Sequence, residues 1–278
     1  MDGNRILKEE GVNILPPDWL SDYQVRTIDA SVISEPGSTG TDWRLHYSIK
    51  LFGLQCDQFL ISRPGVGESF VNFGVNKNDL LLGDAAYCGF RGLAHVSNRG
   101  GYFLVRFKNK AFTLLQENKK EFRMLVELKK LSYGEVGDWS VQATTSNSNN
   151  KLAIRVCAIK KSEEEAEKSL KKVLRAMRKK QRKIDPETLE LHRYVILLTS
   201  LPNNIKRDLI MELYRSRWQI EVAFKRLKSI MGLGHLHKID EESAQAWLHG
   251  KLLVALLAQA IVDEGRFFSP WGYPVQTK

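Results

Sequence analysis

The segment RYVILLTS at residues 193–200 is followed by IKRDLIMELYRSRWQIEVAFKRLKSIM at residues 205–231. The first run is short, apolar and rich in β-branched residues, which predicts a buried strand. In the second run apolar residues recur at helical spacing, which predicts one long amphipathic helix. Pro202 marks the turn between the two. A strand that leads directly into a long helix indicates an α/β fold.

Further strands are predicted on the N-terminal side of this pair. Runs of strand-forming residues separated by short turns occupy residues 25–33, 43–52, 55–62, 80–83 and 102–108, with a helical pattern at residues 90–98. Asp29 lies inside the first of these strands, and Asp84 directly follows the fourth. Two carboxylates are therefore expected on the framework of a sheet.

The middle of the chain changes character. Short alternating segments separated by glycines predict a β-rich insertion over residues 111–160. Ser162 and Glu165 then form a capping box that starts a helix, which Pro186 stops. Its cations are Lys168, Lys171, Lys172, Arg175, Arg178, Lys179, Lys180, Arg182 and Lys183. A solvated helix whose charges match its dipole explains this basic helix at least as well as a DNA contact does.

Composition restricts the class of protein. The chain has 278 residues, of which 43% are hydrophobic and 27% charged, which is typical of a soluble globular protein. The apolar run at residues 252–262 is too short to span a membrane, so the helix predicted at residues 244–262 is expected to pack into the core. The N-terminus lacks a secretory signal, which predicts a cytoplasmic protein. The net charge of +10 favours a polyanionic partner.

Four polar residues of the long helix share one face. Tyr214, Arg217, Glu221 and Lys228 follow one another at spacings of three, four and seven, so they fall in an arc of roughly 60°. An apolar stripe lies beside them: Leu209, Leu213, Ile220, Phe224, Leu227 and Met231. Taken alone, the helix is better explained as a surface helix with ordinary pairs from Arg217 to Glu221 and from Glu221 to Lys225.

The two strand-borne acids change this balance. Asp29, Asp84 and Glu221 together offer the oxygen ligands that Mg²⁺ prefers. Two such ions can stabilise the attacking and the leaving oxygens of a displacement at phosphorus. The three acids therefore predict a divalent-metal site that acts on phosphodiesters. Arg217 and Lys228 would offset repulsion among the acids and bind phosphate.

The complete Tyr214-x2-Arg217-x3-Glu221-x6-Lys228 pattern resembles the signature of the DDE transposases of bacterial insertion sequences, of the insertion-sequence-four type. IDASVI around Asp29, followed by DWRLHYSIKL, resembles the opening strand and hairpin of that family. LLLGDAAYCGFRGL resembles the second block and assigns Asp84, and VILLTSLP resembles the strand before the third acid. The resemblance covers about residues 23–235.

The resemblance implies a ribonuclease-H-like mixed sheet flanked by helices, with the β-rich insertion between the second and third acids. It implies that Asp29, Asp84 and Glu221 are catalytic and bind two Mg²⁺ ions, with Mn²⁺ as an alternative, and that Tyr214, Arg217 and Lys228 hold DNA phosphates. The implied reaction is strand cleavage followed by attack of a 3′-hydroxyl on target DNA. The implied partners are the inverted repeats at the transposon ends, the target DNA and a second copy of the chain, with no membrane.

The predicted organisation divides the chain into six parts. They are an N-terminal remnant at 1–22, a first catalytic part at 23–110, the insertion at 111–160, the basic helix at 161–185, a second catalytic part at 186–265 and a tail at 266–278.

Two features depart from the family pattern. Ala85 follows Asp84, where many relatives have Arg. Only residues 1–28 precede Asp29, where relatives carry a helical domain that reads the transposon end, so an N-terminally truncated member is expected. Two other functions therefore stay open: an inactive DNA-binding remnant, and a ribonuclease-H-like nuclease without strand transfer.

Overall fold

The computed structural model describes residues 15–265 except Thr39, Asn147, Lys180, Arg182, Ile184, Lys238 and Ile239. The chain forms two compact units, and it passes from one to the other more than once. We call residues 1–68, 72–74 and 216–278 the first unit, and residues 69–71 and 75–215 the second unit. Residues 1–14 of the predicted N-terminal remnant at 1–22, and the whole predicted tail at 266–278, lie outside the described residues.

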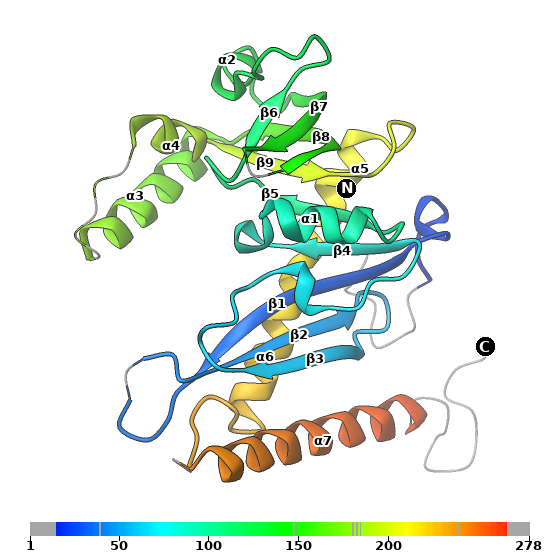
Figure 1. Cartoon of the computed structure of the whole chain (residues 1–278), viewed down its shortest axis with the longest axis vertical. Coiled ribbons are helices and arrows are strands. Elements are labelled where there is room, and N and C mark those ends of the chain that lie inside the picture. Colours follow the sequence, from blue (N-terminus) through cyan, green and yellow to red (C-terminus); the bar gives the residue numbers. More distant parts are fainter. Residues whose placement is uncertain are drawn as a thin grey trace. The chain divides into compact units, whose positions relative to one another are not determined.

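The first unit is an antiparallel sheet covered by two helices (Figure 1). Its strands lie in the order β3-β2-β1, with bounds Cys56–Ser62, Trp43–Lys50 and Gln24–Ile33. The helices are α6, Gln219–Ser229, and α7, Glu241–Gly265, and a short 3₁₀ turn at Asp18–Leu20 precedes β1. Apolar side chains of β1 and β2 form one core with Ile220, Phe224 and Leu227 of α6.

The second unit is a larger sheet with one parallel pair. Its strands lie in the order β4-β5-β9-β8-β7-β6, with bounds Asp79–Gly83, Tyr102–Arg106, Tyr194–Thr199, Ser148–Lys160, Val136–Thr145 and Thr113–Leu115. Strands β4 and β5 are parallel and are joined through α1, Phe90–Ser97, whereas the pairs β5–β9, β9–β8, β8–β7 and β7–β6 are antiparallel. The other helices are α2, Met124–Leu128, α3, Glu163–Lys179, α4, Pro186–Leu191, and α5, Arg207–Arg215.

These elements confirm a mixed α/β chain built mostly from antiparallel strands flanked by helices. The predicted strands around Asp29 and before Asp84 are present as β1 and β4. The predicted capping box is also present: the Glu165 amide donates to Ser162 Oγ at 3.2 Å, and the Ser162 amide to Glu165 Oε2 at 3.4 Å. Helix α3 ends at Lys179, so Lys183 lies beyond it, while the predicted helical cations Lys180 and Arg182 fall outside the described residues.

The prediction of one continuous helix over residues 205–231 is wrong. A 3₁₀ turn at Ser216–Trp218 separates α5 from α6. At this turn the Thr27 hydroxyl of β1 donates a hydrogen bond to the Arg217 carbonyl at 3.4 Å. We attribute the break to this tertiary bond, because a side chain that takes a helix carbonyl competes with the regular ladder. The four signature residues consequently do not share one helix.

The prediction that the last helix packs into the core is correct for only one of its faces. Ala244, Leu248 and Leu252 of α7 are buried, whereas Leu253, Leu257 and Ile261 are exposed. The helix is also longer than the apolar run from which it was predicted. By length and composition alone its residues 241–262 could cross a membrane, and 11% of the apolar window is buried; one such helix is weak evidence for insertion.

Candidate active site

Asp29 is fixed within the first unit by its strand. It lies in β1 opposite Tyr47 of β2, and the Ala30 amide donates a hydrogen bond of 2.8 Å to its Oδ1. Its neighbour Ile28 is fully buried, since side chains alternate between the two faces of a strand. The carboxylate therefore projects from a well-packed sheet.

Arg217 connects two of the predicted acids. Its Nη1 lies 3.6 Å from Asp29 Oδ2, and its Nη2 donates a close hydrogen bond to Glu221 Oε1. The side chains of Arg217 and Asp29 are 16% and 20% exposed, and that of Glu221 is 60% exposed. The first and third acids of the predicted site thus converge on one guanidinium, although their positions are far apart in the sequence.

Helix α6 places Glu221 at this position. Ile220 is completely buried, and Phe224 packs against Tyr47 with ring centroids 5.8 Å apart. These apolar contacts hold the helix on the sheet while Glu221, on the adjoining face, points to Arg217. Lys228 lies two turns further along α6 and is exposed.

Asp84 lies in the second unit at the end of β4. Its Oδ1 accepts a hydrogen bond of 2.7 Å from the Ala86 amide, which caps the 3₁₀ turn Ala85–Tyr87. All five residues of β4 are buried. A Cβ at Gly83 would lie 2.9 Å from Phe70 Cζ and from Tyr87 Cβ, so only glycine fits directly before Asp84. The position of this acid is therefore as tightly specified as that of Asp29.

The predicted DNA-binding residues are divided between the units. Tyr214 is half-buried on α5 of the second unit, and Arg217 and Lys228 belong to the first. The structure brings Asp29, Arg217 and Glu221 together within one unit, and it holds Asp84 and Tyr214 within the other.

The residues of the first unit fit a divalent cation in their chemistry. Two carboxylates from different elements converge where the chain itself supplies a positive charge, and carboxylate oxygens are the ligands that Mg²⁺ accepts. Among the residues that the structure describes, no group of three His, Cys, Asp or Glu side chains forms a complete metal site. Asp29 and Glu221 alone supply two carboxylates, fewer than such a group requires.

Two features of this site escape sequence reasoning. Thr27 supports the Arg217 backbone through its hydroxyl, and no pattern distinguishes it from other strand threonines. Trp218 directly follows Arg217 in the sequence, and it is 44% exposed.

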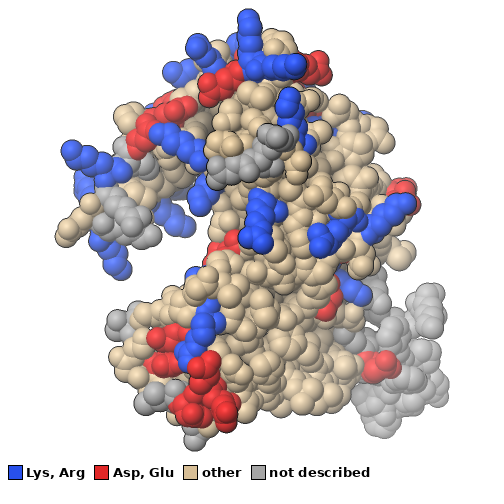
Figure 2. Space-filling view, viewed as in Figure 1, with Lys and Arg blue, Asp and Glu red and all other residues tan. Residues whose placement is uncertain are grey.

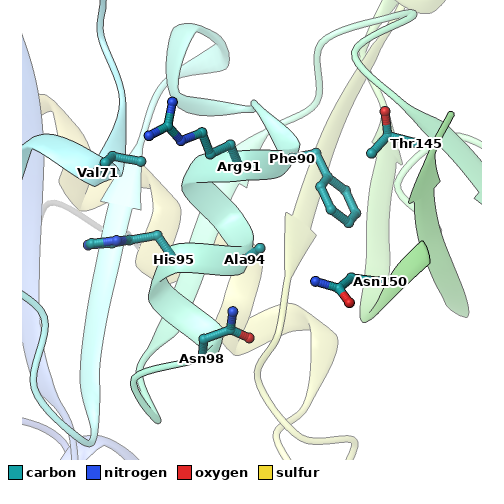
Figure 3. Close-up of a pocket in the computed structure, with 8 residues that line it drawn as sticks. All are labelled: Val71, Phe90, Arg91, Ala94, His95, Asn98, Thr145 and Asn150. Atoms are coloured by element: carbon teal, nitrogen blue, oxygen red, sulfur yellow. The ribbon is translucent and has the colours of Figure 1, made fainter. Parts of the chain in front are cut away.

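A separate cavity of about 610 Å³ lies in the second unit (Figure 3). It is lined by Phe90, Arg91, His95 and Asn98 from α1 and by Thr145 and Asn150 from the β7–β8 hairpin, together with Val71 and Ala94. Figure 3 shows the Phe90 ring projecting from α1 toward the side occupied by Asn150. The cavity contains none of the predicted catalytic residues.

Comparison with known proteins gives consistent results. Residues 68–257 match the family model described as a transposase DDE domain. The chain is 32% identical over 258 residues to the transposase for insertion sequence element IS421 of Escherichia coli, which covers 90% of this chain and 69% of that protein. It is 24% identical over 278 residues to the transposase for insertion sequence element IS231B of Bacillus thuringiensis subsp. berliner, which covers 89% of this chain and 58% of that protein.

Proposed function

The chain belongs to the DDE transposase family, and from this premise we propose that it cleaves DNA at the ends of an insertion sequence and transfers the resulting strand to target DNA. The family acts on DNA and uses divalent metal ions. The observation that carries the assignment of residues is the convergence of Asp29 and Glu221 on Arg217.

We assign Asp29, Asp84 and Glu221 as the metal ligands, with two Mg²⁺ ions as the natural complement. When bound, such ions activate the attacking oxygen and stabilise the leaving oxygen of the phosphodiester. The attacking groups are water in the cleavage step and the freed 3′-hydroxyl in the transfer step. The proposal includes a ribonuclease-H-like arrangement of the strands and a cytoplasmic location.

Three further side chains would hold the DNA. Arg217 offers a bidentate fork and Lys228 a point charge to the phosphates, and Tyr214 offers a hydroxyl. In this proposal Arg217 exchanges carboxylates for phosphate as substrate and metal arrive. A second copy of the chain would complete a dimer that holds both transposon ends.

The experiment is cleavage and joining of DNA that carries the element's own ends, measured in Mg²⁺. Asp29→Asn, Asp84→Asn and Glu221→Gln are each expected to lower the cleavage rate by a factor of about 1,000 or more, as loss of a group central to electrostatic stabilisation does. Asp208→Asn and Glu242→Gln are matched controls, since both acids are exposed and outside the site.

The same assay separates the other functions. DNA binding without cleavage by the unsubstituted chain would indicate a non-catalytic remnant. Cleavage whose 3′-ends never join a second duplex would indicate a nuclease. Unchanged cleavage in all three acid variants would contradict the site assignment itself.

A further inference from the structure

The C-terminal part of α3 carries six cations on one face. Lys168, Lys171, Lys172, Arg175, Arg178 and Lys179 fall within an arc of about 120° at 100° per residue. The opposite face of the helix carries Ala166, which is buried, and the half-buried Leu170, Val173 and Met177. The apolar side faces the protein, so the cations face solvent. Figure 2 shows Lys and Arg side chains gathered over this helix.

Acidic residues neutralise only the first part of this face. Lys168 pairs with Glu164 at 2.6 Å and Lys171 with Glu167 at 3.2 Å. Within the part of the chain that the structure describes, no ion pair involves Lys172, Arg175, Arg178 or Lys179. A helix that was merely solvated and stabilised by its own pairs would continue the alternation of charge into these last turns.

We propose that this basic face of α3 is a docking surface for the phosphate backbone of duplex DNA, separate from the grip assigned to Tyr214, Arg217 and Lys228. The inference rests on the proposed function only in that DNA is the polyanion on which the family acts. From Lys168 to Lys179 the face is about 16 Å long, which equals the axial rise of roughly five base pairs of duplex DNA.

The chemistry of this surface suits DNA binding that does not depend on the base sequence. The six residues of this face are all exposed lysines and arginines, and the face includes no apolar side chain or side-chain amide that could read a base. Contacts of this kind go to phosphates, bind all sequences alike and depend steeply on salt. The surface would therefore hold DNA near the enzyme regardless of sequence, whether that DNA is an end or a target.

The test is the salt dependence of binding, measured with the full chain and a fluorescent duplex of arbitrary sequence in EDTA, which prevents cleavage. The logarithm of the DNA association constant falls as the logarithm of the salt concentration rises. The triple variant Lys172→Gln/Arg175→Gln/Lys179→Gln is expected to reduce the magnitude of this slope by about 2 to 3 between about 50 and 200 mM KCl. The matched control is Lys119→Gln/Lys120→Gln/Lys129→Gln, which removes the same charge from exposed positions of the same unit. Its slope is expected to change by less than about 1.

An unchanged slope in the α3 variant, or equal reductions in both variants, would overturn the inference, since net charge rather than this face would then determine binding. Arg175→Gln alone, expected to lower the slope by about 1, keeps the test valid if the triple variant is unstable. Preference of the α3 face for anionic lipid vesicles over DNA would also overturn it. A failure of the proposed catalysis is distinguished from a failure of this inference, because cleavage is measured separately, in Mg²⁺ and with end-containing DNA.

Discussion

Arg217 Nη1 lies 3.6 Å from Asp29 Oδ2, and this contact joins the turn before α6 to the strand that carries the first acid. The same guanidinium donates to Glu221. Two carboxylates placed together repel one another, and a cation between them offsets that repulsion. Arg217 thereby holds both side chains close to one another, which prepares the proposed site for a divalent ion.

Replacement of Arg217 tests this role. Arg217→Gln is expected to lower the melting temperature in EDTA, because Asp29 and Glu221 lose their shared cation, and millimolar Mg²⁺ is expected to restore part of the loss. Since Glu221 is largely exposed, the cost is expected to be about 1 kcal/mol. Thermal unfolding with and without Mg²⁺ measures the effect. Lys225→Gln, on the same helix, is the control, and an equal Mg²⁺ response in both variants would count against the bridge.

Gly83→Ala tests how Asp84 is positioned. The added methyl group would meet Phe70 and Tyr87 at 2.9 Å, so we expect a loss of about 1–3 kcal/mol and a displaced Asp84. Urea unfolding measures the first effect and DNA cleavage the second. Gly65→Ala, where a Cβ meets nothing within 4 Å, is the control. Full stability together with full cleavage in Gly83→Ala would show that this packing does not position the acid.

How much of this arrangement could be predicted depends on the range of the interactions. Strands β1 and β4 follow from local patterns, because period-two and wholly apolar runs are short-range signals. The pairing of Arg217 with Glu221 follows from helical spacing, whereas the approach of Arg217 to Asp29 depends on how α6 packs against the sheet. The sequence contains the residues of that contact without the geometry that creates it.

The wrong prediction of one continuous helix and the partly correct prediction for α7 fail for the same kind of reason. The continuous helix through Ser216 is interrupted where Thr27, from a distant strand, bonds to the Arg217 carbonyl. The burial of α7 was inferred from its apolar composition, yet that composition surrounds the whole helix while only the side with Leu248 and Leu252 meets the core. Local propensity describes an isolated segment, and it does not determine which tertiary contacts that segment makes with the rest of the chain.

A buried arginine, paired with a partly exposed aspartate, supports the second unit. Arg155 is 6% exposed and donates to Asp138 at 2.5 Å, and to the carbonyls of Pro202 at 2.6 Å and Ile205 at 3.1 Å. It therefore holds the turn that leads into α5. Arg155→Met is expected to cost about 3 kcal/mol in urea unfolding, because it leaves the Asp138 carboxylate and two backbone carbonyls without their buried partner.

The control for this prediction is Arg193→Met. Arg193 makes only exposed pairs, with Glu163 and Glu190, and its replacement is expected to cost less than about 1 kcal/mol. Similar losses in the two variants would show that burial does not strengthen the Arg155 network.

Burial of His46 predicts a dependence of stability on pH. Its Nε2 lies 3.0 Å from Ser62 Oγ, and burial, aided by Arg44, lowers the pKa of His46 to about 4. In the unfolded chain the pKa of a histidine is about 6.5. Between about pH 4 and pH 6.5 the unfolded state binds a proton at His46 that the folded state does not bind. The contribution of His46 to the free energy of unfolding is therefore constant above about pH 6.5 and is lost as the pH falls toward about 4.

The measurement is urea unfolding across this range of pH. We expect the unfolding free energy to fall by up to about 1.4 kcal/mol per pH unit from this residue. His46→Gln should be less stable at neutral pH and should lack this component of the slope, while His249→Gln, at an exposed position, should retain it. The same slope in both variants would exclude His46 as its source.

The route of the chain through the two units has a consequence for biosynthesis. The second unit consists almost entirely of one uninterrupted stretch, residues 75–215, whereas the first is begun by β1–β3 and completed only by residues 216 onward. On the ribosome, domains fold as their sequence emerges. Trp43, Leu45 and Ile49 therefore lack their helical cover until α6 and α7 have been translated, which leaves apolar surface exposed on the nascent first unit.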